Sequence, residues 1–165
     1  MGEARRYSYI GPAELRSLPR TASTVLETPA DLDCWLAAQR PAEVDEPFTF
    51  VVTVDGSLRL APRRSEHVTC AAGQDVLAAG EMAFVRTSAG WAVREVSNQS
   101  TGYCPDPSSW PAVAAALARA GIAHPPGFTA EIVFRRCAAC GAHNVVRDGD
   151  YTCALCDSAL EVSAR

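Results

Sequence analysis

The sequence predicts an α+β protein, in which a mainly antiparallel sheet and two or three helices precede a small cysteine-rich C-terminal unit. β-Branched and aromatic runs joined by short turns recur in the middle of the chain, and two segments carry apolar residues at helical spacing. Four of the seven cysteines form two close pairs near the end. We therefore divide the chain into an N-terminal arm (1–30), an α+β domain (31–130) and the cysteine-rich unit (131–165).

Two helices are predicted from capping and periodicity, besides a short one at residues 12–18 of the arm. Residues 28–31 read Thr-Pro-Ala-Asp, a capped helix start, and this helix should run to about residue 39 before a proline stops it. A second helix should span residues 109–119 and end at a glycine. The residues expected to face the core are Leu32, Trp35 and Leu36 in the first helix, and Trp110, Val113, Ala114 and Leu117 in the second.

The strands follow from β-branched runs and from the turns between them. Residues 48–54 read Phe-Thr-Phe-Val-Val-Thr-Val, and the Asp-Gly pair at 55–56 turns the chain into a return strand at 57–60. Further strands are expected near residues 66–70, 80–86 and 91–97. A last strand at 129–134 should lead into the cysteine-rich unit.

The cysteines follow the pattern of a metal site. Cys137 and Cys140 are separated by two residues, as are Cys153 and Cys156, and twelve residues lie between the pairs. Two such knuckles supply the four corners of a tetrahedron, the geometry that structural Zn2+ prefers. Residues 144–151 carry two valines followed by Asp-Gly-Asp, which predicts a β-hairpin between the knuckles. The pattern identifies the C-terminal unit as a zinc ribbon.

The predicted role of this zinc is structural. Catalytic zinc keeps three protein ligands and an open position, whereas four thiolates close the coordination shell. His143 lies just after the first knuckle and could replace a ligand, but a surface position is the alternative. Four thiolates also suit iron, so the spacing alone does not separate the two metals.

The charge of the ribbon disfavours nucleic acid as a partner. Residues 131–165 hold four arginines and five acidic residues, and the whole chain has a net charge of -4. Four thiolates with one Zn2+ would add about two further negative charges. A phosphate-binding surface needs clustered positive charge, which only the Arg-Arg pair at 135–136 offers. Another protein is the expected partner.

Composition favours a bacterial cytoplasmic protein. All fifteen basic residues are arginine, which with the abundant alanine is typical of a high-GC bacterial genome, and which excludes lysine-based catalysis. No apolar run approaches the roughly 20 residues that cross a membrane, and the first twenty residues lack the apolar core of a signal peptide. Three scattered cysteines remain outside the pairs, which fits a reducing compartment.

The central segment resembles a bacterial pattern. A Glu-His pair at 66–67, Ala-Gly-Glu at 79–81 and Asn-Gln-Ser-Thr-Gly-Tyr-Cys-Pro at 98–105 follow one another. This order resembles some effector and polymorphic-toxin domains, in which Glu-His precedes Ala-Gly-Glu and Asn-x-Ser-Gly-His-Tyr-x-Pro. Thr101 and Gly102 stand where that pattern has glycine and histidine. The resemblance implies a shared fold segment, without the histidine that would act as acid or base.

The same residues carry the alternative hypothesis, an enzyme or toxin-like domain. Cys104 would be the nucleophile, His67 its base, and Glu81 or Asn98 would orient that base. Tyr103 would donate a hydrogen bond or stack on a ring. The structural alternatives are a buried thiol before a proline, a solvent-facing strand histidine, a strand-end acid and local turn formers.

A ligand-binding group is also predicted. Arg63 and Arg64 lie near His67 and would bind an anionic ligand, or else form a solvated turn after a proline. Asn98 and Ser100 are the other predicted ligand-binding residues. The leading hypothesis is a small bacterial zinc-binding protein that acts as a protein- or ligand-binding module.

Overall fold

The computed structural model describes residues 2–19 and 22–163 and confirms the α+β class. Over these residues the main sheet has five antiparallel strands in the order β1-β3-β2-β4-β5. The strands are β1 (Thr24–Leu26), β2 (Phe48–Thr53), β3 (Leu58–Ala61), β4 (Val76–Thr87) and β5 (Gly90–Val96). The Asp-Gly turn joins β2 to β3 as predicted, and Gly56 adopts a φ of 83° that a side chain would disfavour.

The helices are α1 (Pro29–Ala37), α2 (Pro41–Val44), α3 (His67–Cys70) and α4 (Trp110–Arg119), with 3-10 turns at Ala13–Ser17 and Pro107–Ser109. The capping box of α1 is confirmed: Thr28 Oγ1 accepts from the Asp31 N–H at 3.3 Å, and the Asp31 carboxylate accepts from the Thr28 N–H at 2.8 Å. Backbone N–H donors of Glu27 and Thr28 lower the pKa of Asp31. None of the helices in the described ranges is both long and apolar enough to span a bilayer.

Two hydrophobic clusters lie on opposite faces of the sheet because side chains alternate along each strand. In β2, Phe48, Phe50 and Val52 pack against α1 and α4, whereas Val51 faces the other cluster. The predicted core residues of α1 are buried, as are Val113 and Leu117 of α4. Trp110 is half-buried, with its ring centroid 5.1 Å from that of Phe128.

The strand predicted at 66–70 is wrong, because these residues form helix α3. Val68, Thr69 and Cys70 are all buried, and Val68 and Cys70 pack in the same cluster as Val51 of β2 and Ala61 of β3. The helical turn closes locally, since the Thr69 N–H and hydroxyl both donate to the Glu66 carbonyl. Local β-propensity predicted the wrong element here because contacts with the rest of the fold decide it.

Two segments of the predicted arm join the main sheet. β1 pairs with β3, and Tyr7 forms a bridge with Val76 at the start of β4, where the Tyr7 N–H donates to the Val76 carbonyl at 2.8 Å. Strand β4 begins at Val76, four residues earlier than the strand predicted at 80–86. Residues 1, 20 and 21 of the arm and 164–165 of the ribbon lie outside the described residues.

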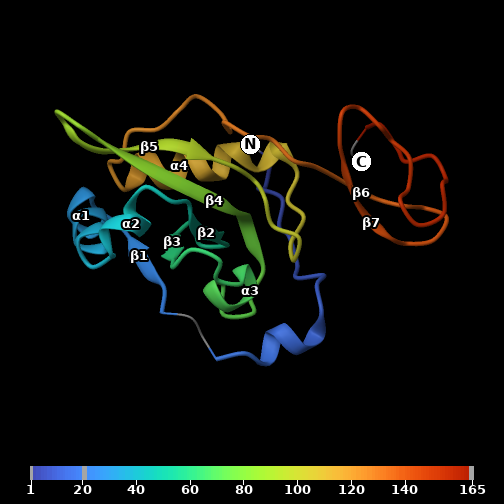
Figure 1. The fold of residues 1–165 in the computed structure, drawn as a ribbon, viewed down its shortest axis with the longest axis horizontal. Helices are drawn as coiled ribbons and strands as arrows, with labels where there is room; N and C mark the ends of the chain where they lie inside the picture. Colours follow the sequence, from blue (N-terminus) through green and yellow to red (C-terminus); the bar gives the residue numbers. More distant parts are fainter. Residues whose placement is uncertain (1, 20–21, 164–165) are drawn as a thin grey trace.

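The C-terminal hairpin lies beside the main sheet, at the end of the chain in Figure 1, and consists of β6 (Val133–Arg136) and β7 (His143–Val146). This corrects the hairpin predicted at 144–151. Strand β7 pairs with β6, on the other side of the first cysteine knuckle, and the predicted Asp-Gly turn is closed by an isolated Arg147–Asp150 bridge. β6 begins later than predicted because residues 129–130 run along β5, where the Thr129 N–H donates to the Val96 carbonyl at 2.8 Å.

Candidate metal centre

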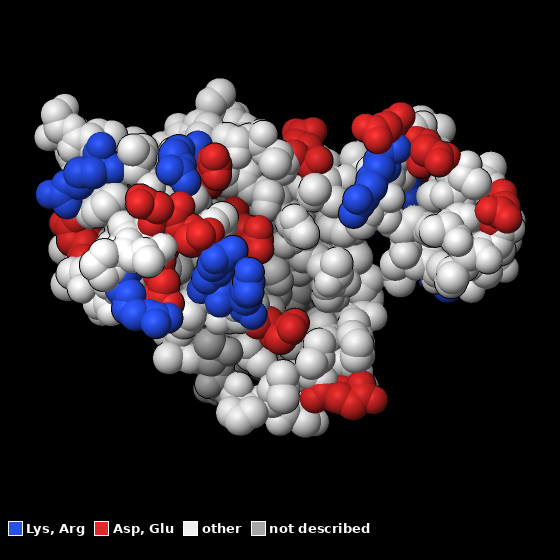
Figure 2. Space-filling view, viewed as in Figure 1, with Lys and Arg blue, Asp and Glu red and all other residues white. Residues whose placement is uncertain are grey.

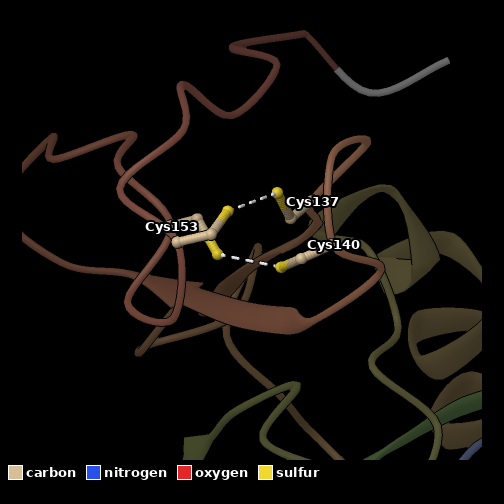
Figure 3. A group of neighbouring side chains, drawn as sticks. Cys137, Cys140 and Cys153 are labelled. Atoms are coloured by element: carbon tan, nitrogen blue, oxygen red, sulfur yellow. Dashed lines mark hydrogen bonds between the residues drawn. The ribbon is translucent and has the colours of Figure 1, made fainter.

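The four predicted cysteines converge at the loop that joins β6 to β7, where the second pair meets the first. Their Sγ atoms all lie within 4.8 Å of one another. The Sγ atoms of Cys137 and Cys156 are 3.6 Å apart, as are those of Cys140 and Cys153 (Figure 3). A disulfide would require about 2.05 Å. Metal–sulfur bonds of about 2.3 Å in a tetrahedron place the sulfurs about 3.8 Å apart, so the cluster fits a four-coordinate metal ion.

The two knuckles have the same backbone geometry. In the first, the Gly141 N–H donates to the Cys137 carbonyl at 2.9 Å, and in the second the Asp157 N–H donates to the Cys153 carbonyl at 3.0 Å. Both Gly141 and Asp157 are left-handed, with φ of 77° and 58°. Each turn thereby directs its two sulfurs to one point.

Asn144 joins the knuckles and was missed by the sequence analysis. Its Oδ1 accepts from the Ala154 N–H at 3.0 Å, while Nδ2 donates to the Ala142 carbonyl at 3.1 Å and lies 3.6 Å from the Cys153 sulfur. The side chain is buried on β7. An amide offers a donor and an acceptor together, so it can satisfy backbone groups from both knuckles. The signal in the sequence that could have indicated this role is the position of Asn144 between the two cysteine pairs.

Hydrogen bonds favour the thiolate form, which is the form that binds metal, at Cys153 and Cys156. The Leu155 N–H, followed by that of Cys156, outweighs burial and lowers the pKa of Cys153 to about 6. The hydroxyl and N–H of Ser158 lower the pKa of Cys156. The Ala142 N–H also acts to lower the pKa of Cys140, but proton sharing with Cys156 and burial outweigh it and raise the value to about 12.

The apolar core around the cysteines is small. The described cluster consists of Cys137, Cys153 and Leu160, with Ala142, Val146 and Tyr151 partly buried against it. Cys140 and Cys156 belong to the exposed side of the knuckles. So little apolar burial stabilises a hairpin only weakly, and a bound metal would therefore supply most of its stability.

Asn98 and Arg135 anchor the hairpin to the main domain. Asn98 is fully buried, and its Nδ2 donates to the carbonyls of Pro105 and Ile132, at 2.8 and 2.7 Å, while Oδ1 accepts from the Ile132 N–H at 2.7 Å. Arg135 lies 4.0 Å from the Asp106 carboxylate. The predicted ligand-binding residue Asn98 therefore holds the segment that leads into the metal unit.

His67 and Glu81 have separate surroundings. His67 lies on α3, where Nε2 is 2.8 Å from the Gly80 carbonyl oxygen and desolvation lowers its pKa. Glu81 follows Gly80 on β4 and lines a hollow of ≈310 Å³ together with Glu95 of the neighbouring strand. Within the described ranges no hydrogen bond or ion pair joins the side chains of His67 and Glu81.

Tyr103, Cys104 and Ser100 form a closed turn. The buried Tyr103 donates its hydroxyl to the Gln74 carbonyl at 2.7 Å, and burial raises its pKa. Cys104 has a φ of 45° and donates its thiol to the Thr101 carbonyl at 3.4 Å. Ser100 is buried, and its carbonyl accepts from the Cys104 N–H at 2.7 Å. The hydrogen bonds of Cys104 and of the Ser100 carbonyl therefore stay within residues 100–104, whereas the Tyr103 hydroxyl binds the chain at Gln74.

Arg63 and Arg64 lie in an exposed turn after Pro62. Arg63 pairs with Glu46 at 3.2 Å, where both side chains are substantially exposed, and Arg64 has a left-handed φ of 64°. An exposed pair of this kind contributes about 0–1 kcal/mol. This geometry matches the predicted solvated turn.

We expect Cys104 to be a slow nucleophile. Burial raises its thiol pKa to about 11, so the thiolate is scarce at pH 7 and increases as the pH rises towards that value. Iodoacetamide at pH 7 should alkylate the exposed Cys34 at least tenfold faster, as quantified by peptide mass spectrometry. Faster labelling of Cys104 than of Cys34 would instead support the nucleophile hypothesis.

Comparisons with protein-family models, curated proteins and solved structures give no match to this chain. The resemblance of the central segment to effector domains therefore gains no support from a family model. The metal centre remains the feature on which a functional conclusion can be based.

Proposed function

We propose that this chain is a zinc-stabilised binding module that docks on another protein through its C-terminal ribbon. The observation that carries the proposal is the convergence of four cysteine sulfurs within 4.8 Å. An all-sulfur shell with no position left for water favours structural Zn2+ over a catalytic metal. Zinc would fix the two knuckle turns relative to each other.

The surface of the ribbon supports a protein as the partner. Leu155, inside the second knuckle, is 79% exposed, and Val162 and Val145 are 65% and 39% exposed. All three belong to the C-terminal unit, and Leu155 is the most exposed of the large apolar side chains named for the described residues, which makes it the natural point of contact with a partner. The metal would hold Leu155 at a fixed tip, which reduces the entropy lost on docking.

The anchoring of the ribbon supports the same proposal. Asn98 holds Ile132 by two hydrogen bonds, and Arg135 donates to the carbonyls of Glu161 and Val162 at 2.9 and 3.0 Å. The first contact holds the segment before β6 to the main domain, and the second ties the end of the chain to β6, so the strand that leads into the first knuckle starts from a fixed point on the main domain.

The test measures metal content and capture together. Elemental mass spectrometry of the purified protein should give one zinc per chain, and iron in its place would overturn the choice of metal. Cross-linked capture from cells that naturally contain the protein should then recover a defined protein that Leu155→Ser loses. Leu18→Ser, at another exposed leucine, is the matched control and should retain it. Equal recovery by both variants would contradict docking through the ribbon.

A further inference from the structure

A groove lies between the N-terminal segment and the ribbon. Two hollows of ≈300 and ≈230 Å³ adjoin there. They share the residues Arg5, Cys104, Phe134, Arg135 and Arg136. Because five residues line both hollows, the two lie next to each other, and an extended chain could reach from one into the other.

The groove has a basic end and an acidic end. Arg6 and His143 line only the first hollow, whereas Asp106 and Glu161 line only the second. These residues are far apart in the sequence, so the concentration of charge is created by the fold. In a chain with a net charge of -4, a basic end of this kind is a local exception.

The cations at the basic end are available to a ligand. Over the described residues, no carboxylate pairs with Arg5 or Arg136. Arg6 pairs with Glu3 at 3.3 Å, but both side chains are more than half exposed, so a ligand carboxylate can replace Glu3 at little cost. The Arg5 guanidinium lies over the Tyr7 ring at 5.2 Å, which holds it at the wall.

Arg135 forms the wall between the two ends. Its side chain is only 13% exposed and donates to the carbonyls of Phe134, Glu161 and Val162 at 2.8–3.0 Å. With its donors used internally, Arg135 shapes the groove, whereas Arg5, Arg6 and Arg136 face the ligand.

We infer that the groove binds an extended segment of a protein partner whose acidic side chains meet Arg5, Arg6 and Arg136. This inference rests on the proposed protein-docking function. Guanidinium groups recognise carboxylates by paired hydrogen bonds, and an extended backbone can lie along two adjoining hollows. The acidic side chains of the segment would meet only the basic end, because Asp106 and Glu161 at the other end repel any anion, and a polynucleotide carries a phosphate at every step. Acidic and basic side chains are interspersed over the face in Figure 2, without a broad basic area for nucleic acid.

The test uses fluorescence anisotropy with three labelled probes: an octapeptide with Glu at its first and third positions and Ser elsewhere, its counterpart with Gln in place of Glu, and an eight-nucleotide oligo-dT. The zinc-loaded full chain should bind the Glu peptide at least tenfold more tightly than the Gln peptide or the oligonucleotide. The double variant Arg5→Gln/Arg136→Gln should lose at least tenfold of that affinity.

Arg40→Gln/Arg86→Gln is the charge-matched control, because both side chains are largely exposed and do not line the groove. It should stay within twofold of the wild type. NMR shift mapping of the wild-type chain with the Glu peptide should place the largest shifts on groove residues. This measurement tests the inference even if a variant folds poorly. Tighter oligonucleotide binding, equal losses in both double variants, or no peptide binding would each overturn the inference. Capture through Leu155 is measured separately, so a failure of the groove proposal is distinguished from a failure of the proposed docking function.

Discussion

Chelation of the metal, or Cys137→Ser, should unfold residues beyond about 134 while the main sheet stays folded. Structural zinc in comparable small units supplies about 10–16 kcal/mol of apparent binding free energy, and folding depends on it. The described apolar cluster of the ribbon contains only a few side chains, so little else opposes unfolding. The main domain keeps its two clusters on the faces of the sheet.

Hydrogen exchange read by mass spectrometry distinguishes the two parts of the chain. Amides of β6 and β7 should lose protection after chelation, and those of β2 and β4 should keep it. Cys34→Ser removes an exposed cysteine far from the cluster and should change neither region. Retention of a protected hairpin without metal would show that the cysteines are not what holds the ribbon.

Asn98→Leu should destabilise the main domain and release the segment that leads into the ribbon. The substitution has similar volume but removes three hydrogen bonds, and it leaves two carbonyls and one N–H without their partner in a buried site. Each unsatisfied buried group costs about 1–3 kcal/mol, so we expect a loss of about 3 kcal/mol or more in the free energy of unfolding.

Urea unfolding followed by circular dichroism measures this loss. Gln99→Ala is the matched control, because the neighbouring side chain is exposed and should stay within about 0.5 kcal/mol of the wild type. A loss below about 1 kcal/mol for Asn98→Leu would mean that other contacts hold Ile132. Exchange at the Ile132 amide should rise in the variant, since its acceptor is gone.

Features that depend on a few neighbouring residues were predictable. The Thr-Pro-Ala-Asp start of α1, the Asp-Gly turn between β2 and β3 and the two cysteine knuckles each form from side chains within four positions of one another. Their geometry is set by local bonding that the residue types already imply. The convergence of the two knuckles on one point then follows from the ligand chemistry of four thiolates.

The segment at 66–70 shows where local patterns fail. Its residue types favour a strand, yet packing of Val68, Thr69 and Cys70 against the rest of the fold makes it a helix. The hairpin predicted between the two knuckles is wrong for a related reason. Its strand β7 gains more by pairing with β6 than by folding back on residues 147–151.

The sequence by itself determined the α+β class, the capped first helix and which four cysteines cluster, because each rests on short-range chemistry. Only the tertiary structure decided that Asn98 binds the backbone of Ile132, 34 residues away, that Asn144 joins the knuckles, and that Arg5 and Arg136 line one groove. These roles arise from long-range contacts between polar side chains, and no periodicity or spacing encodes which distant backbone group an amide or a guanidinium will meet.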